Sequence, residues 1–211
     1  MGRMTLLSWR RSVGDVYLQV RAQAAGGDPA GAHATWRAGR DRLFGTHPDS
    51  PIRPEHRASF AGLRYAPYDP DLRWELAVDT DVAAQRRDVP TATDGVVPFE
   101  RVGRVHLPDG RGGLDVWWLE QYGGGVFVPL KDATAGRTTY GGGRYLLDTV
   151  KGADLGGAAD GSTLVIDLNF AYQPSCAYDP DWVCPLPSPG NMLPGEVAAG
   201  ELYAAERYGA G

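Results

Sequence analysis

The sequence predicts a mainly β, α+β fold: an antiparallel β-barrel or sandwich, capped by two N-terminal helices and followed by an irregular, proline-rich C-terminal strap. Apolar residues recur at helical spacing near the N-terminus, whereas the middle of the chain alternates short apolar runs with turn-forming residues. The 29 glycines and 16 prolines among 211 residues lie between these runs, so they indicate frequent turns rather than disorder.

The first helix is expected from a single apolar side, because its remaining positions are polar. That side consists of Leu6, Trp9, Val13, Val16, Tyr17 and Val20. Asp28-Pro29 predicts the start of a second helix, since aspartate caps free N–H groups and proline suits the first turn. This helix is expected to end before Gly45. We therefore divide the chain into an N-terminal helical extension, residues 1–28, and a single β-rich domain, residues 29–211.

The strands are expected from apolar runs bounded by turn signals. Residues 72–78 alternate apolar and polar side chains, which is typical of a half-buried strand. Pro108-Asp109-Gly110 and the glycines at 123–125 join further runs into an antiparallel meander. A pair of strands is expected to flank the glycines at 141–143. The other expected strands cover residues 102–107, 114–120, 126–130 and 162–169.

Composition and charge exclude several classes of partner. The formal net charge is −5 and no long basic run occurs, so neither a nucleic acid nor an anionic membrane is an expected partner. No run approaches the roughly 20 apolar residues of a membrane-spanning helix, and the N-terminus does not read as a signal peptide. We expect a cytoplasmic protein. The arginine-rich, lysine-poor composition is typical of a GC-rich bacterial genome.

Asp167 and Asn169 are the first candidates for chemistry. They lie two residues apart in an expected strand, so their side chains share one face. If that face lines an interior, they enter a pocket as acceptor and donor. If it faces water, they are ordinary surface residues.

The stretch TTYGGGRYLLD, which starts at Thr138, is the second candidate. Gly142 and Gly143 let the backbone approach another group closely, and Arg144 follows between Tyr140 and Tyr145. A guanidinium beside exposed N–H groups is suited to a carboxylate or phosphate. The alternative is a glycine-rich hairpin turn with a solvated arginine.

Residues 171–187, AYQPSCAYDPDWVCPLP, form the segment that we call the strap. Its prolines favour a rigid, extended segment that must lie on other structure, with Tyr172 and Tyr178 packed beneath it. Cys176 and Cys184 are the only cysteines, and three roles stay open: buried thiols, a disulfide, or a nucleophile. A nucleophile needs a nearby base. No metal-ligand spacing is present, so no metal site is expected.

Four stretches of the chain together resemble a known family. They are WRAGRDRLFGTHPDSPI, LRYAPYDPDLRWEL, VFVPLKDATAGRTTYGGGRYLLD and DLNFAYQPSCAYDPDWVCPLPSPGNMLP. In this order they resemble the bacterial and archaeal domain of unknown function 1684 family over about residues 35–201. The resemblance implies a fold and recurrent positions rather than a reaction. The chain departs from the family pattern at Gln173 and Asp179, where asparagine is expected, and at Gly190, where an acid is expected.

The family resemblance makes a shared site the main hypothesis. The recurrent positions are Tyr140, Gly141, Gly142, Gly143, Arg144, Tyr145, Asp167, Asn169, Tyr172, Cys176, Tyr178, Cys184 and Asn191. The expected substrate-binding residues are Tyr140, Gly142, Gly143, Arg144, Tyr145 and Tyr178. The expected catalytic residues are Asp167, Asn169, Tyr172 and Cys176. In this hypothesis Arg144 and Asp167 meet around a vacant space under the strap, which acts as a lid.

That site would suit an enzyme that needs no cofactor and acts on a small anionic organic molecule in a bacterial pathway, with a specialised pathway as one option. Asp167 moves a proton, Asn169 or a tyrosine hydroxyl polarises the substrate, and the strap excludes water. Isomerisation, cyclisation, elimination and hydrolysis all fit this arrangement.

Two other classes of function stay open. The same pocket would hold a flavin or another ligand in a binding module. Alternatively, Arg144 and Asp167 form a buried ion pair and the protein acts through its surface as a homodimer. Trp117 and Trp118 are candidates for that surface, because adjacent residues of a strand point to opposite faces.

Overall fold

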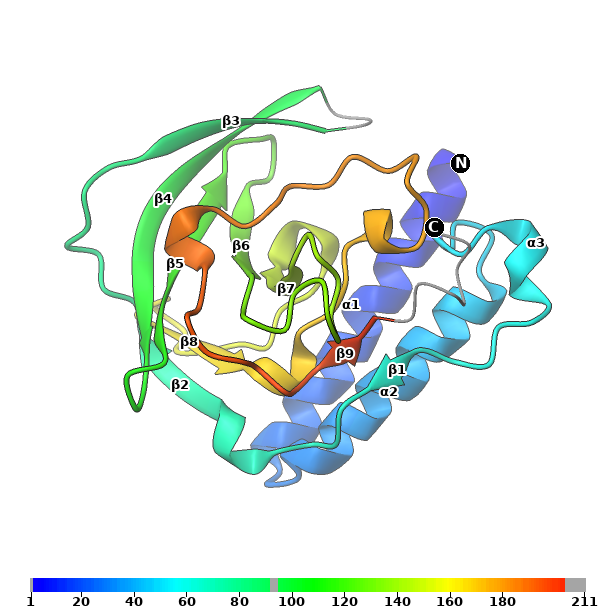
Figure 1. Ribbon diagram of the computed structural model, residues 1–211, viewed down its shortest axis with the longest axis horizontal. Helices are drawn as coiled ribbons and strands as arrows, with labels where there is room; N and C mark the ends of the chain where they lie inside the picture. Colours follow the sequence, from blue (N-terminus) through cyan, green and yellow to red (C-terminus); the bar gives the residue numbers. More distant parts are fainter. Residues whose placement is uncertain (1, 92–94, 204–211) are drawn as a thin grey trace.

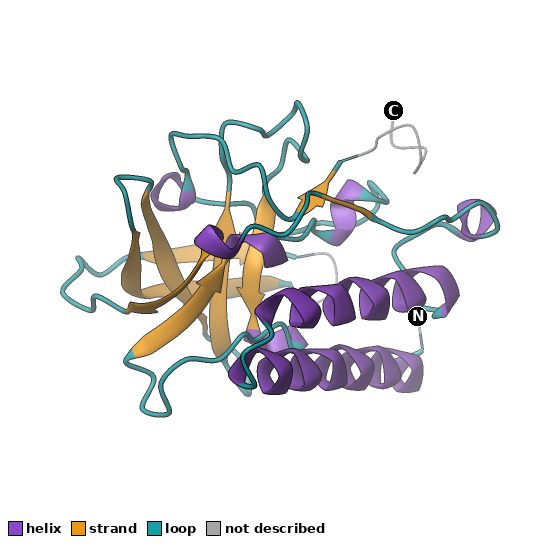
Figure 2. Cartoon of the chain, turned by 90° about the horizontal axis from the view of Figure 1, so that it is seen from below, coloured by secondary structure: helices purple, strands orange, loops and turns teal. Residues whose placement is uncertain are grey.

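The computed structural model describes residues 2–91 and 95–203. The chain begins with two long helices, α1 (Arg3–Ala25) and α2 (Pro29–Thr46), which lie side by side against the β structure (Figure 1 and Figure 2). The side chain of Asp28 accepts a 2.8 Å hydrogen bond from the amide of Gly31, so the expected cap of the second helix forms. Gly39 lets the helices approach closely, because a Cβ atom there would lie 2.6 Å from Val16.

The largest sheet is antiparallel and has five strands in the order β3-β4-β5-β6-β7. They are β3 (Arg86–Pro90), β4 (Val96–Leu107), β5 (Gly112–Leu119), β6 (Gly125–Leu130) and β7 (Arg144–Asp148). The expected meander is confirmed. Strand β3 was not expected, because its sequence RRDVP is mostly charged and carries little apolar signal.

Two short antiparallel pairs complete the β structure. Strand β2 (Arg73–Ala77) pairs with β8 (Thr163–Asp167), and β1 (Arg64–Tyr65) pairs with β9 (Glu201–Leu202). The remaining helical segments are α3 (Pro54–Arg57) and the 3-10 turns Pro70–Leu72, Thr149–Lys151, Leu168–Phe170, Ser175–Ala177 and Pro189–Asn191. The result is a sandwich-like α+β fold, and no sheet among the described residues closes into a barrel.

The strand expected before the glycines at 141–143 does not form. The hydroxyl of Thr134 donates to the carboxylate of Asp132 at 2.9 Å and lies 2.8 Å from the hydroxyl of Thr139. These bonds close the segment into consecutive turns, because side chains satisfy groups that a ladder would otherwise pair.

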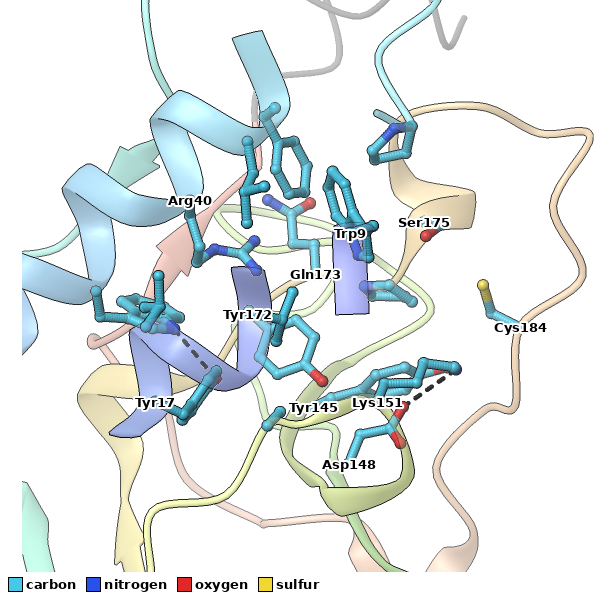
Figure 3. Close-up of a pocket in the computed structure, with 18 residues that line it drawn as sticks. Trp9, Tyr17, Arg40, Tyr145, Asp148, Lys151, Tyr172, Gln173, Ser175 and Cys184 are labelled. Carbon is cyan, nitrogen blue, oxygen red and sulfur yellow. Dashed lines mark hydrogen bonds and ion pairs between the residues drawn. The ribbon is translucent and has the colours of Figure 1, made fainter. Parts of the chain in front are cut away.

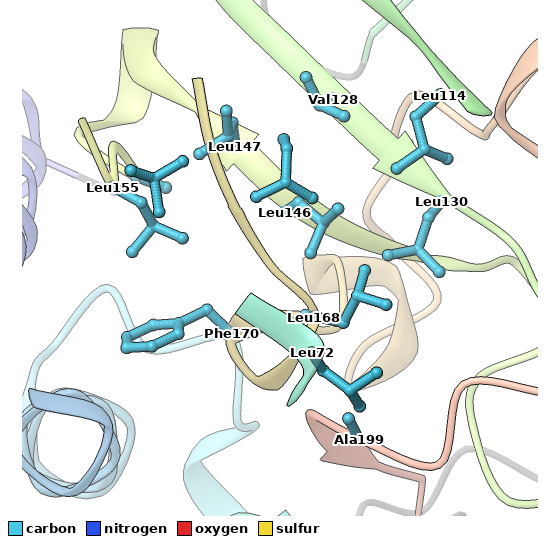
Figure 4. Packing of buried hydrophobic residues seen from close by; sticks show 14 of the residues in the cluster. Leu72, Leu114, Val128, Leu130, Leu146, Leu147, Leu155, Leu168, Phe170 and Ala199 are labelled. Carbon is cyan, nitrogen blue, oxygen red and sulfur yellow. The ribbon is translucent and has the colours of Figure 1, made fainter. Parts of the chain in front are cut away.

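The hydrophobic core lies between the large sheet and the helices. Leu146, Leu147 and Leu168 pack together there (Figure 4), and all three are fully buried. Val16 and Val20 of α1 belong to the same cluster. Burial of a leucine or valine side chain stabilises a fold by roughly 1.5–3 kcal/mol, so the first helix contributes directly to this core.

The strap, residues 171–187, is irregular as expected, apart from one 3-10 turn. Tyr172 exchanges backbone hydrogen bonds of 2.8 and 2.9 Å with Tyr145 of β7. The amide of Gln173 donates to the carboxylate of Glu201 at 3.0 Å. The strap therefore lies on β7 and beside the C-terminal strand β9.

Only one of the two adjacent tryptophans is exposed at the surface. Trp117 is buried, whereas Trp118 is 40% exposed, which agrees with their placement on opposite faces of β5. Among the described helices, none has both the length and the apolar character that crossing a membrane requires.

We predict that Asn191→Ala lowers the free energy of unfolding by about 3–5 kcal/mol, because buried donors and acceptors lose their partners. The Asn191 side chain donates to the carbonyls of Asp115 and Pro129, at 2.8 and 2.9 Å. It also accepts hydrogen bonds from Trp117 and Ser188. Urea unfolding measures the change. Ser188→Ala is the control and is expected to cost about 1 kcal/mol; equal losses for both variants would contradict the prediction.

Candidate functional site

A cavity of about 120 Å³ lies between the two N-terminal helices and the start of the strap (Figure 3). Its walls are mostly aromatic and apolar. The lining residues are Trp9, Val13, Val16, Tyr17, Trp36, Arg40, Leu43, Phe44, Pro51, Tyr145, Asp148, Lys151, Ala153, Tyr172, Gln173, Pro174, Ser175 and Cys184. Tyr17, Trp36, Asp148 and Gln173 are buried, whereas Trp9, Ser175 and Cys184 are half-buried. The first group therefore forms the floor of the cavity and the second lies toward its mouth.

Asp148 places a carboxylate at the floor of the cavity. It is the last residue of β7 and is 2% exposed. Its Oδ2 lies 3.1 Å from the Nζ of Lys151. Its Oδ1 is buried and has no hydrogen-bond partner among the described residues. A buried acceptor is costly when it stays unpaired, so a donor that reached this oxygen from the cavity would stabilise it.

Tyr172 points its hydroxyl into the same space, toward the part of the cavity where Asp148 and Lys151 lie (Figure 3). The hydroxyl makes no hydrogen bond within the described residues, although the backbone of Tyr172 is paired with β7. Burial raises the pKa of Tyr172 well above its ordinary value, and the Asp148 carboxylate adds to the shift. The phenol therefore stays protonated and serves as a hydrogen-bond donor.

Arg40 brings a cation from α2 to the cavity. Its Nη2 donates to Glu201 at 2.7 Å and its Nε donates to the hydroxyl of Tyr65 at 3.1 Å. The guanidinium lies 5.0 Å from the ring centre of Tyr172 and 5.1 Å from that of Trp36, a cation–π arrangement. Within the described residues its Nη1 makes no hydrogen bond, so one donor edge of Arg40 is available.

Arg144 is not part of this cavity. It is 1% exposed and donates to the backbone carbonyls of Val197 and Ala199. An Nη atom also lies 3.5 Å from the carboxylate of Asp132. Burial lowers the pKa of Arg144, and Asp132 opposes that effect. The guanidinium thus holds the C-terminal segment in place. Arg144 is therefore neither a solvated arginine nor part of an open anion-binding site, which were the two alternatives that the sequence left open.

The glycines before Arg144 serve packing. Gly143 has φ +90°, and a Cβ atom there would lie 2.7 Å from both the carbonyl of Leu130 and the ring of Pro187. At Gly142 a Cβ atom would lie 2.5 Å from the ring of Tyr140. Only glycine fits such close approaches, because real Cβ atoms do not come that near.

Asp167 and Asn169 form a second, separate polar cluster. The Asp167 carboxylate accepts hydrogen bonds from the backbone and side-chain amides of Asn169, at 3.0 and 2.8 Å, and lies 3.3 Å from Arg73. Asn169 in turn exchanges hydrogen bonds with the backbone of Asp69. The expected strand 162–169 therefore ends at Asp167, whose carboxylate caps a 3-10 turn. Burial raises the pKa of Asp167, although the bonds from Asn169 oppose it.

The expectation that Arg144 and Asp167 meet around one vacant space is wrong. Arg144 is paired with Asp132, Asp167 is paired with Arg73, and neither residue lines the cavity. The physical reason is that each buried charge has a closer partner of opposite sign, which satisfies it locally.

Two of the expected site residues, Tyr145 and Tyr172, do line the cavity. Tyr178 lies behind it and donates a short hydrogen bond to Glu201. Tyr140 packs on Tyr203, with ring centres 5.4 Å apart.

Both cysteines are free thiols, but only one lies at the cavity. Cys184 lines it, whereas Cys176 does not. No group of three or more His, Cys, Asp or Glu side chains is placed to hold a metal ion in the part of the chain that the structure describes.

Sequence reasoning missed Arg40 and Asp148, although each carried a signal. Arg40 lies on the same helical side as Trp36, Leu43 and Phe44, which is an unusual place for a charge. Asp148 ends the apolar run YLLD, where a carboxylate follows directly on a buried strand. Lys151 and the floor residues of α1 had no comparable sequence signal that marked them as cavity residues.

A family model described as "Protein of unknown function (DUF1684)" matches residues 58–202. The chain belongs to this family. The resemblance seen in the sequence is thereby confirmed. An uncharacterized protein of Haloarcula marismortui, solved by solution NMR, is 34% identical; the match covers 79% of this chain and 89% of that chain, with a TM-score of 0.57. None of the curated proteins matches.

The residues that line the cavity lie partly inside and partly outside the range matched by the family model. Tyr145, Asp148 and Tyr172 lie within the matched residues, whereas Arg40 and the other lining residues of α1 and α2 precede them. The two sets of residues come together only because the helices pack against the DUF1684 part of the chain.

We predict that Arg144→Met lowers the free energy of unfolding by about 3–5 kcal/mol, because it leaves the Asp132 carboxylate buried without its cation. Urea unfolding measures the change. Arg137→Met is the matched control: its ion pair with Glu196 is exposed, so the expected loss is below about 1 kcal/mol. Similar losses for the two variants would show that Arg144 does not hold the C-terminal segment.

Proposed function

We propose that this protein binds a small organic molecule in the cavity between the helices and the strap, and that Asp148 transfers a proton to or from it. The observation that carries the proposal is the buried Oδ1 of Asp148, which has no hydrogen-bond partner among the described residues and lies at the cavity floor. Proton transfer of this kind is the common step of isomerases, cyclases, lyases and hydrolases that work without a bound cofactor.

The size of the cavity limits the guest. An apolar cavity of about 150 Å³ accommodates a benzene molecule. The volume of about 120 Å³ therefore suits a guest whose buried part is near the size of one six-membered ring. Aromatic walls from Trp36 and Phe44 favour a flat or apolar body. This volume supports a small substrate over a flavin, whose ring system is larger.

The polar groups around the cavity indicate what the guest carries. The free donor edge of Arg40 and the Tyr172 hydroxyl suit a carboxylate or carbonyl oxygen. Two buried acceptors, the Oε1 of Gln173 and the Oδ1 of Asp148, have no hydrogen-bond partner within the described residues. They suit a guest that carries a hydrogen-bond donor. In this proposal Arg40 takes the anion-binding role that the sequence suggested for Arg144.

The chemistry follows from these placements. The substrate oxygen accepts hydrogen bonds from Arg40 and Tyr172, which stabilises negative charge as it develops. Asp148 then accepts the proton from the neighbouring carbon or heteroatom. In this proposal the protein works in the bacterial cytoplasm on a free small molecule, alone or as a homodimer.

We predict that 10 mM sodium benzoate raises the melting temperature of the protein by about 3–6 °C, if it binds with a Kd near 1 mM. Tyr172→Phe should reduce this shift, because the phenol no longer donates to the carboxylate. Without benzoate the variant should melt at an equal or higher temperature, since the lost hydroxyl has no partner in the described part of the chain. Differential scanning calorimetry measures both effects.

Two controls accompany this measurement. Tyr145→Phe removes a buried hydroxyl that donates to the carbonyl of Pro185 at 2.6 Å, so it should lower the melting temperature without ligand. Tyr122→Phe alters a fully exposed tyrosine and should change neither value. An unchanged melting temperature of the wild-type protein in benzoate, or an equal shift in Tyr172→Phe, would refute binding at this site.

We predict that the protein accelerates exchange of the α-protons of phenylpyruvate with D₂O, and that Asp148→Asn lowers the rate at least about 100-fold. Proton NMR follows the exchange. Asp167→Asn is the matched comparison, and its rate per folded molecule should stay near that of the wild-type protein. Loss of exchange in Asp167→Asn but not in Asp148→Asn would reverse the assignment, and no exchange with the wild-type protein would leave a binding function only.

A further inference from the structure

The two cysteines come together beside the cavity, whose mouth Cys184 lines, although they lie eight residues apart in the strap. The backbone amide of Cys176 donates to the Sγ of Cys184 at 3.4 Å. The interaction of the two side chains shifts their pKa values in opposite directions. Both residues are half-buried, so reagents can reach them from the solvent side. The strap therefore folds back on itself in a way that places the Cys184 sulfur against the backbone of Cys176.

The surroundings make the two sulfurs unequal. Hydrogen bonding with Cys176 lowers the pKa of Cys184 to about 6; burial opposes this effect, and the nearby Lys151 ammonium supports it. The interaction with the Cys184 side chain, together with burial, raises the pKa of Cys176. Cys184 is therefore the thiolate of the pair near neutral pH, and Cys176 keeps its proton.

The other titratable groups near the pair act in the same direction or stay neutral. Lys151 is held by Asp148 at 3.1 Å, and its side chain is more than half exposed. Tyr140 is a neighbour of Cys176, and burial raises the pKa of Tyr140. Burial likewise raises the pKa of Tyr145 and of Tyr172, so all three phenols are neutral neighbours of the thiolate.

We propose that Cys176 and Cys184 form a redox-active dithiol at the mouth of the cavity, in which Cys184 attacks a small-molecule disulfide and Cys176 resolves the product. The arrangement assigns the attacking role to the cysteine that lines the cavity, whereas the sequence had suggested Cys176. This site stands on the contact between the Cys176 amide and the Cys184 sulfur, so it does not depend on the guest proposed for the cavity.

The exchange balances with a small disulfide, RSSR, as the oxidant. The Cys184 thiolate attacks one sulfur, the S–S bond of RSSR breaks, and RS⁻ leaves. The new mixed disulfide carries no charge, so the thiolate that favoured the protonated form of Cys176 is gone. Cys176 then gives its proton to the first RS⁻ and attacks the Sγ of Cys184. A second RS⁻ leaves and takes from water the proton that Cys184 released when it ionised. Two protein thiols have then been oxidised to one disulfide, and one RSSR has been reduced to two RSH.

Disulfide formation would close a ring across the strap between residues 176 and 184. Ser175 and Cys184 both line the cavity, so the bond would hold this part of the mouth in one conformation. Because a closed ring reduces the freedom of the unfolded chain as well, the oxidised protein should unfold at higher urea concentration.

Oxidised glutathione tests the proposal on the full-length protein, with mass spectrometry as the readout. The wild-type protein should lose two hydrogen atoms and retain little bound glutathione. Cys176→Ser should stop at one glutathione on Cys184, because the resolving thiol is missing. Cys184→Ser should react at least about tenfold more slowly at pH 7, since Cys176 has little thiolate. Circular dichroism verifies that both variants are folded.

Equal reaction rates for the two single variants would overturn the assignment of Cys184 as the attacking thiol. A wild-type protein that carries glutathione on both cysteines, or that does not react, would overturn the dithiol itself. These results are independent of benzoate binding and phenylpyruvate exchange, so this proposal and the proposed function can fail separately.

Discussion

The carboxylate of Glu201 is the interaction on which the candidate site depends. It is completely buried, so it needs a cation and hydrogen-bond donors to offset its loss of water. Arg40 supplies the cation from α2, the amide of Gln173 donates from the strap, and the hydroxyl of Tyr178 donates from further along the strap. One carboxylate therefore ties the second helix, the strap and the last strand together, and the cavity is the space that remains among them.

Polar side chains elsewhere in the fold pair buried backbone groups. The segments between β8 and β9 have few ladder partners, yet their backbone groups are buried and must be paired. Arg144 pairs carbonyls of the C-terminal segment, Asn191 joins its own irregular segment to carbonyls of β5 and β6, and Asn169 pairs the backbone of Asp69. Residues that look like catalytic groups in the sequence thus hold irregular backbone in place.

The cavity itself combines two parts of the chain. Its acid and its central phenol come from the residues that match the DUF1684 model, whereas Arg40 and most of its aromatic wall come from the helices that precede the match. The proposed proton-transfer group and most of the apolar surface that would contact the guest are therefore carried by different segments. In this arrangement, changes in α1 and α2 would alter the guest without touching Asp148.

The features that depend on neighbours along the chain can be read from the sequence alone. Helical periodicity and the Asp28-Pro29 cap predicted both helices, turn residues predicted the meander, and prolines predicted the irregular strap. The partners of Arg144 and Asp167 were decided only by the tertiary structure, because each charge pairs with whichever opposite charge the packing places nearest. The same is true of the cavity: Arg40 and Asp148 are more than a hundred positions apart, and no local pattern states that a helix and a strand end will face each other.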